Sequence, residues 1–288
     1  MIRISIVTIT FNAARSLQRT LDSVRRQTYP HIEHLIVDGA SKDDTVRIAE
    51  QYKATSPHEV IIQSEPDKGL YDAMNKGLQK ATGDYVVYLN AGDSLYAEDT
   101  IEKVVNAASP HPSSITPHPS SITPHPSSIT PHTSDVIHHP SSISQLPAVV
   151  YGDTATTDSE GRFLHLRRHR PPKKLTWRSF KKGMLVCHRA FYARLDIARQ
   201  FPYNLKYRHS ADVDWCIRIM KEADRLGLPL VNVNVIVANF EEGGDTTQHH
   251  RASLLERFNV MATHYGYVQT ILLHGWFVVR SAFLRFSK

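Results

Sequence analysis

The first ninety residues alternate two hydrophobic periods, and this alternation restricts the chain to few folds. The strand-like apolar runs are RISIVTIT (3–10), HLIVD (34–38), VIIQS (60–64) and YVVYLN (85–90). Between them, residues 14–27 and 71–80 carry apolar side chains at helical spacing. Strands that alternate with helices predict an α/β fold, with a Rossmann-like, mostly parallel sheet flanked by helices.

Two helix starts are marked by capping residues. Ser41 is followed three residues later by Asp44, a spacing that resembles a capping box, so we expect a helix from there through Tyr52. Ser210 is the expected N-cap of a helix within the segment YRHSADVDWCIRIMKEA, residues 207–223. Acidic residues in the first turn of that helix would also complement its dipole.

Polar residues follow the strand-like runs where each one ends. The segments concerned are Thr8–Asn12, Asp38, Glu65–Gly69 and Asn90–Asp93. The carboxyl ends of parallel strands meet at one rim of the sheet, where α/β proteins bind their ligands. Asp and Asn also favour turns, which is sufficient to explain any one of these positions. Four such polar segments at one rim together indicate a metal-binding or sugar-binding site.

Length and composition favour one main domain in a reducing compartment. The chain has 288 residues, of which 41% are hydrophobic, enough for one good core. The N-terminal MIRISIVTITF lacks the charged region and apolar stretch of a signal peptide, so we expect a cytoplasmic protein. Cys187 and Cys216 lack metal-type spacing and are expected to be free thiols.

Residues 109–147 differ in composition from the segments on either side. The heptapeptide PHPSSIT occurs three times without change between Pro110 and Thr130. Two prolines in each repeat exclude a helix, and one Ile in each repeat provides too little apolar surface for a core. We expect an exposed, disordered insertion whose regularly spaced histidines form at most weak metal sites.

Positive charge is concentrated in one block. Residues 162–208 contain fourteen Lys or Arg and a single acid, Asp196, so the rest of the chain is net acidic. Such a block either meets phosphates, an anionic membrane or nucleic acid, or is a solvated face. No recognised nucleic-acid motif accompanies it. The segment TITFNAARS also lacks the glycine-rich loop of nicotinamide enzymes and nucleotidyltransferases.

Several segments, taken in order, resemble the motifs of family-2 glycosyltransferases with the GT-A fold, in particular the bacterial exopolysaccharide and lipopolysaccharide branch. They are TITFN, SLQRTLDSVRRQTYPHIEHLIVDGASKDDT, EPDKGLYDAMNKGLQKATGDYVVYLNAGD and SADVDWCIR. The resemblance implies a nucleotide-sugar-binding half over residues 1–108 and an acceptor-side half over residues 148–248. A C-terminal helical tail would occupy residues 249–288.

The resemblance also implies roles for residues within these motifs. Asp212 matches the general base, and Asp214 an acceptor-side residue. Asp93 is the one carboxylate left of a metal motif, because Asn90 and Gly92 stand where the family usually has aspartates. The donor nucleotide and sugar would be bound by Thr8, Phe11, Asn12, Asp38, Asp67, Lys68, Gly69, Asn75 and Asn90.

On this resemblance we expect an inverting glycosyltransferase of cell-surface polysaccharide biosynthesis. It would move a sugar from a nucleoside-diphosphate sugar to a glycan or to an acceptor linked to polyprenyl diphosphate. UDP is the expected carrier, with GDP and dTDP left open. Mg²⁺ or Mn²⁺, held through Asp93, would stabilise the leaving diphosphate. The reduced metal motif leaves one alternative, a catalytically degenerate scaffold with the same fold.

The basic block and the C-terminal tail are the segments expected to contact a membrane. Acceptors in this branch often lie at the inner membrane face, where basic side chains meet lipid phosphates. The apolar residues of the tail, 267–288, are interrupted by His274, Arg280 and Arg285, so a membrane span is not expected. The tail either lies at the membrane interface or packs on the core or on a partner subunit. The basic residues concerned are Arg167, Arg168, Lys173, Lys174, Lys181 and Lys182.

Overall fold

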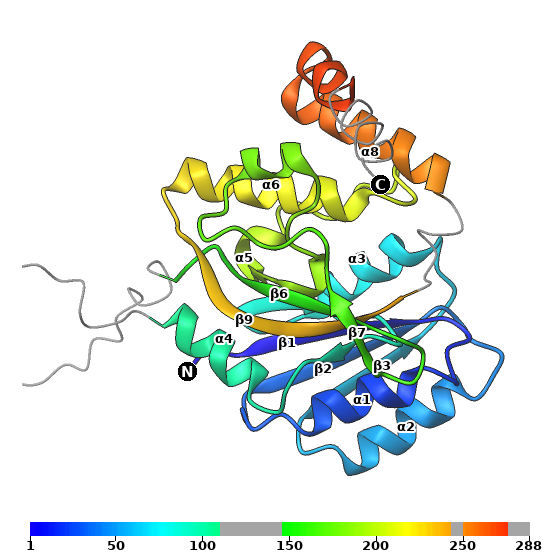
Figure 1. Cartoon of the computed structure of the whole chain (residues 1–288). Helices are drawn as coiled ribbons and strands as arrows, with labels where there is room; N and C mark the ends of the chain where they lie inside the picture. Colours follow the sequence, from blue (N-terminus) through cyan, green and yellow to red (C-terminus); the bar gives the residue numbers. More distant parts are fainter. Residues whose placement is uncertain (110–145, 243–249, 276–288) are drawn as a thin grey trace, which may run out of the picture.

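The computed structural model describes residues 1–109, 146–242 and 250–275, in which nine strands form one sheet. The strand order is β3-β2-β1-β4-β8-β6-β9-β5, and β7 pairs with β6. Helices cover both faces of the sheet (Figure 1). The PHPSSIT repeats and the end of the tail, including Arg280 and Arg285, lie outside the described residues, so the expectations for them stay predictions.

The first half of the sheet follows the predicted alternation. β1 pairs in parallel with both β2 and β4, and β2 pairs in parallel with β3. Every residue of β1 and β2 is buried, as expected for parallel strands covered on both faces. The elements are β1 (Ile4–Thr10), α1 (Leu17–Arg25), β2 (Ile32–Asp38), α2 (Thr45–Thr55), β3 (Glu59–Ser64), α3 (Leu70–Lys80) and β4 (Tyr85–Tyr88).

The second half of the sheet is mixed. β8 pairs antiparallel with both β4 and β6, whereas β6 and β9 are parallel. The α/β class predicted from the sequence is therefore confirmed, with antiparallel pairs added in this half. Its elements are β5 (Ser94–Leu95), α4 (Thr100–Ala108), β6 (Val149–Thr157), β7 (Phe163–Leu166), the 3-10 helices η3 (Trp177–Lys182) and η4 (His188–Ala190), β8 (Phe191–Arg194), α5 (Leu195–Ala198), α6 (Ala211–Leu226), β9 (Leu230–Glu241) and α8 (His250–Tyr265).

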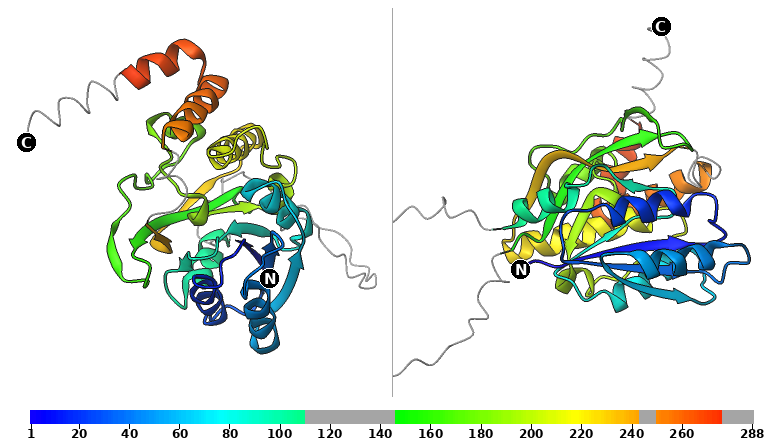
Figure 2. Two further views of the ribbon diagram at one scale, coloured as in Figure 1. Left: turned by 90° about the vertical axis from the view of Figure 1, so that its right-hand side faces the viewer. Right: turned by 90° about the horizontal axis from the view of Figure 1, so that it is seen from below.

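The helices form layers on the two faces of the sheet. α1 and α2 cover one face, where Leu17 and Leu21 pack with Tyr52 and with Ile36 of β2 (Figure 1). α3, α5 and α6 lie on the other face, over a larger core that includes Trp215. α8 packs against α6 on the side away from the sheet, and the helical residues after it reach farther out (Figure 2). Among the described helices, none is long and apolar enough to cross a membrane.

The structure differs from the prediction in different ways at the starts of α2 and α6. Asp44, the N-cap residue of α2, makes no capping hydrogen bond with its side chain, so the predicted capping box is wrong. The Ser41 side chain instead donates to Asp38, and its backbone N–H donates to Asp38 Oδ2 at 2.9 Å. Ser210 does occupy the N-cap position of α6, but its hydroxyl donates to the carbonyl of Ser253 on α8 at 3.3 Å. Ser41 Oγ also accepts from the backbone N–H of Asn12 at 2.8 Å, so both serines connect separate segments.

α3 approaches β1 closely at Gly77, where a Cβ would lie 2.4 Å from Cγ1 of Val7. Gly77→Ala must displace the helix or the valine, so we expect it to lower the free energy of unfolding by about 1–3 kcal/mol. Urea denaturation measures this change. Gln79→Ala, at an exposed position of the same helix, is the control and should change stability by less than about 0.5 kcal/mol. Equal stability of the two variants would contradict the close approach.

Candidate active site

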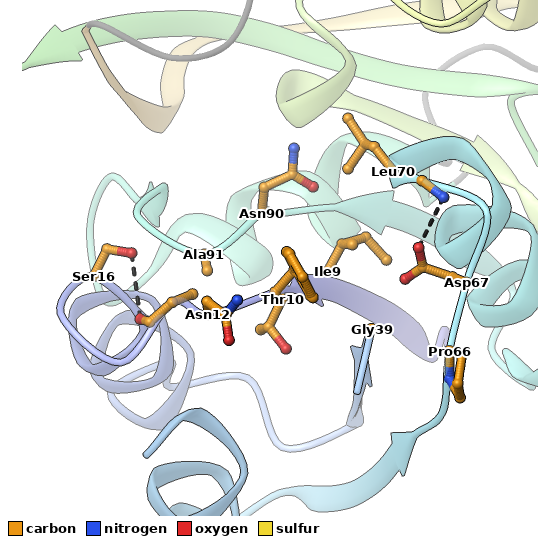
Figure 3. A pocket seen from close by; sticks show the side chains of 13 residues that line it. Ile9, Thr10, Asn12, Ser16, Gly39, Pro66, Asp67, Leu70, Asn90 and Ala91 are labelled. Atoms are coloured by element: carbon orange, nitrogen blue, oxygen red, sulfur yellow. Dashed lines mark hydrogen bonds between the residues drawn. The ribbon is translucent and has the colours of Figure 1, made fainter. Parts of the chain in front are cut away.

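A cavity of about 730 Å³ opens where the ends of β1, β2 and β4 and the loop after β3 come together. The structure thus brings all four predicted strand ends to one rim. Figure 3 shows the lining side chains on these separate segments. Those that the sequence predicted for the donor are Phe11, Asn12, Asp67, Gly69 and Asn90.

Asp67 and Gly39 determine the shape of one wall of the cavity (Figure 3). Oδ1 of Asp67 accepts a hydrogen bond from the backbone N–H of Gly69 at 2.8 Å, which holds the loop before α3. A Cβ at position 39 would lie 2.6 Å from Oδ2 of Asp67. Glycine at position 39 is therefore what leaves room for the Asp67 carboxylate. Lys68 belongs to the same loop but does not line the cavity.

Asp38 is buried and holds the loops around the cavity together. Its carboxylate accepts from Thr10 Oγ1 at 2.9 Å, from Ser64 Oγ at 2.7 Å and from the backbone N–H of Ser41 at 2.9 Å. Burial alone would raise the pKa of Asp38, but the hydrogen bonds from Ser41, Ser64 and Thr10 lower it, so the carboxylate is ionised. Its predicted role in binding the donor stays a prediction.

Two other residues predicted at the donor make hydrogen bonds within the protein, and their donor-binding role stays a prediction. Thr8 is fully buried, and its Oγ1 lies 2.9 Å from Nε2 of His34. Asn75 binds both backbone groups of Tyr203: its Nδ2 donates to the carbonyl at 3.0 Å, and its Oδ1 accepts from the N–H at 2.7 Å. Asn75 therefore joins α3 to the segment that leads to α6.

The turn after β4 holds two polar side chains in different surroundings. Asn90 lines the cavity, and its Oδ1 is buried without a hydrogen-bond partner among the described residues. Asp93 is only 3% exposed, and its carboxylate forms an ion pair with Nε of Arg189. Arg189 also donates from Nη1 to Sγ of Cys187 at 3.4 Å, and its guanidinium lies 4.6 Å from the ring centre of Phe240. The carboxylate predicted to hold a metal is thus bound by an arginine.

Positive charge gathers around Arg189. Burial alone would lower the pKa of its guanidinium, but the negative charge of Asp93 raises it, so Arg189 stays protonated. Burial alone would raise the pKa of the Cys187 thiol, yet the charges of Arg189, Arg167 and His188 lower it to about 7. Nη1 of Arg167 is buried with no hydrogen-bond partner within the described part of the chain. The positive charges around Cys187 therefore stabilise negative charge at this place in the structure.

Asp212 lies in the first turn of α6, and both of its oxygens are engaged. Oδ2 lies 3.1 Å from Nδ1 of His188, and Oδ1 accepts from the hydroxyl of Tyr71 at 3.2 Å and from the N–H of Val213 at 2.9 Å. Burial alone would raise the pKa of Asp212, but His188 and then Arg257 and the Val213 N–H lower it. The carboxylate is therefore ionised at neutral pH and held in a fixed orientation.

α8 holds the start of α6 in place. Asp214 Oδ1 lies 2.8 Å from Nε2 of His264 on α8, and its Oδ2 accepts from Nε of Arg218 at 2.7 Å. Glu256, also on α8, accepts from the backbone N–H groups of residues 208–210 at 2.7 to 3.1 Å. The oxygens of Asp214 are thus committed to the scaffold, and its acceptor-side role stays a prediction.

Sequence reasoning missed the partners of the two central aspartates. His188 and Arg189 are adjacent in the apolar run LVCHRAFYA, and they contact Asp212 and Asp93 respectively. A polar pair within an apolar run needs buried partners, because an unpaired buried charge is costly. That signal was present in the sequence. No comparable feature of the sequence indicated that Tyr71 would contact Asp212.

Solved structures of nucleotide-sugar complexes share this fold. S. aureus TarS 1–349 in complex with UDP-GlcNAc matches with a TM-score of 0.62 at 12% identity, covering 94% of this chain and 70% of that one. The mannosyltransferase PcManGT from Pyrobaculum calidifontis, solved with GDP-Man and Mn²⁺, matches with a TM-score of 0.57 at 15% identity, covering 99% and 79%. At these identities the likeness establishes the fold, which is GT-A.

Sequence comparison then gives the family. The family model for "Glycosyl transferase family 2" matches residues 5–198. A PGL/p-HBAD biosynthesis glycosyltransferase of Mycobacterium tuberculosis is 32% identical over 241 residues, which are 83% of this chain and 77% of that protein. The chain belongs to glycosyl transferase family 2 and is a glycosyltransferase. The resemblance read from its motifs is confirmed.

Asn75 allows a structural role to be separated from the predicted donor-binding role. Asn75→Ala removes two hydrogen bonds to the Tyr203 backbone, so we expect the free energy of unfolding to fall by about 1–3 kcal/mol. Urea denaturation measures this loss, and calorimetric titration should show unchanged UDP affinity. Gln79→Ala again serves as the control on α3. A large loss of UDP affinity at unchanged stability would instead support the donor-binding role.

Proposed function

We propose that this protein transfers a sugar, with inversion, from a nucleoside-diphosphate sugar to a glycan or to an acceptor linked to polyprenyl diphosphate. The observation that carries the proposal is the link between the strand-end cavity and Asp212. Tyr71 directly follows Leu70, which lines the cavity, and its hydroxyl donates to Asp212 at 3.2 Å. A donor cavity and an ionised carboxylate are therefore joined by the first turn of α3.

The cavity suits a nucleotide sugar. Its volume of about 730 Å³ falls in the range of small-molecule sites. Phe11, whose side chain is 65% exposed, offers an aromatic face for a base, and the amide of Asn12 lies beside it. Asp67 and Asn90 supply polar groups for the ribose or sugar. UDP is the carrier we propose, supported by the UDP-GlcNAc complex of a protein with this fold.

Asp212 is the proposed general base. As the acceptor hydroxyl attacks the anomeric carbon from the face opposite the diphosphate, its proton passes to the Asp212 carboxylate. The bond between the anomeric carbon and the phosphate oxygen breaks, and the nucleoside diphosphate leaves. His188 and Tyr71 hold the carboxylate in one orientation, which is what a positioned base requires. These steps invert the configuration at the anomeric carbon.

The divalent metal expected from the sequence stays a prediction. Mg²⁺ and Mn²⁺ require several oxygen ligands. In the part of the chain that the structure describes, no group of three or more His, Cys, Asp or Glu could hold a metal. Asp93, the predicted ligand, is bound by Arg189. As arranged, these residues do not fit such an ion, and the steps above use none.

Asp212→Asn keeps the shape of the side chain and removes the base. We expect UDP affinity to be retained and transfer to fall by about 10²–10⁴-fold. The readout is UDP release from UDP-sugars in the presence of a polyprenyl-diphosphate-linked saccharide. Asp224→Asn, at an exposed position near the end of α6, is the matched control and should transfer normally. Near-normal transfer by Asp212→Asn would overturn the assignment. A wild-type protein that binds UDP but turns over no nucleotide sugar would instead favour the degenerate scaffold.

We further propose that the enzyme acts as a peripheral protein at the inner face of the cytoplasmic membrane. The helical residues 250–275 expose six large apolar side chains, each between 47% and 74% accessible. Lys181 of η3 lies close to this helical region, because its Nζ is 5.4 Å from the ring centre of Tyr265 on α8. Lys182 follows it in η3. Apolar side chains next to basic ones suit an anionic lipid surface. The exposed residues are Leu254, Leu255, Tyr267, Val268, Ile271 and Leu272.

Flotation with anionic liposomes tests this contact. The double variant Ile271→Ser, Leu272→Ser should lose most of its binding, since it removes apolar area from the exposed face. High salt should also weaken binding by the wild type. Leu205→Ser, at an exposed leucine outside this helical region, is the control and should float like the wild type. If the double variant floats as well as the control does, the contact is not made by this face.

A further inference from the structure

The turn after β4, residues 90–93, leads from the cavity to two carboxylates that are each bound by an arginine. Asp93 pairs with Arg189, and Glu241, at the end of β9, pairs with Arg19. A Cβ at Gly92, whose φ is 100°, would lie 2.8 Å from Oε2 of Glu241. The Glu241 carboxylate therefore occupies the space that a side chain at position 92 would need. One oxygen of each of these two carboxylates is thus paired with an arginine.

The cationic groups near this turn, by contrast, still have N–H groups available. A guanidinium has five N–H donors in a rigid fork, and Arg189 uses Nε for Asp93 and Nη1 for Cys187. Its side chain is 15% exposed, so part of it reaches solvent. Arg167, whose charge also acts on the Cys187 thiol, has a buried Nη1 without a partner among the described residues. A buried N–H group without a partner is costly, so charged donors of this kind favour the binding of an anion.

The turn whose Asp93 pairs with Arg189 also borders the cavity. Asn90 and Ala91 line the cavity, and the backbone N–H of Asp93 donates to the carbonyl of Asn90 at 3.0 Å, which closes the turn. The Asp93 side chain then fixes Arg189 through Nε. Asp93 thereby orients an arginine at the position where the sequence predicted that it would hold a metal.

We propose that Arg189, oriented by Asp93 and assisted by Arg167, binds the donor diphosphate in place of a divalent cation. This inference rests on the proposed function, because it concerns the leaving group of the same reaction. As the bond from the anomeric carbon to the phosphate oxygen breaks, the electron pair moves to that oxygen, and the guanidinium N–H groups stabilise the new charge. No proton is transferred in this contact, because Arg189 stays protonated throughout.

Calorimetric titration of the wild-type protein with UDP and, in parallel, GDP, each in EDTA and in MnCl₂, tests the inference without any substitution. We expect one of the two nucleotides to bind equally well in both buffers. Binding that requires Mn²⁺ would overturn the inference and leave the proposed function standing. If neither nucleotide binds in either buffer, the donor-site proposal fails together with the inference.

Substitutions then test the residue itself. Arg189→Gln should weaken UDP binding in EDTA by about ten- to a hundredfold while uridine binding stays unchanged, since only the diphosphate contact is lost. Arg189→Lys keeps the charge and should recover part of the affinity. Arg170→Gln is the matched control, because Arg170 also pairs with a buried aspartate, Asp153, at a different cavity. Unchanged UDP affinity in folded Arg189→Gln, with folding checked by circular dichroism, would overturn the inference.

Discussion

The parallel pairing of β1 with β2 and β4 is the constraint on which the rest of the structure depends. Because the three strands run in one direction, the residues that follow them meet at one rim and enclose the cavity. Asp38 secures that rim, because its buried carboxylate binds Thr10 and Ser64 from the two neighbouring strands. The cavity that we propose as the donor site is therefore a consequence of strand direction, stabilised by one aspartate.

The second half of the chain supplies the partners of the two central aspartates, Asp212 and Asp93. His188 and Arg189 are adjacent on η4, and each contacts an aspartate from a different element. Asp212, from α6, is held ionised beside His188 and Tyr71. Asp93, from the turn after β4, is neutralised by Arg189. One short 3-10 helix thus connects the group proposed to take the proton with the group proposed to meet the diphosphate.

The sequence predicted features that depend on local pattern and left out those that depend on distant contacts. The run HLIVD falls within β2, and β3 begins one residue before VIIQS, because apolar periodicity is a local property. The rim residues Phe11, Asn12, Asp67 and Asn90 followed from the strand ends and the family motifs. The Asn75 contact with Tyr203, the Asp214 contact with His264 and the Arg189 contact with Asp93 join residues far apart in the chain. Periodicity contains no information about such pairs.

Hydrogen–deuterium exchange of the protein with and without a bound nucleoside diphosphate tests the central claim most directly, namely that the strand-end cavity is the donor site. The account predicts slower exchange in residues 11–13, 39–41, 67–70 and 90–93, which form or flank the cavity wall. The second cavity, near Arg170 and Asn234, should show no change. Protection at that second cavity, with none at the strand ends, would contradict the account.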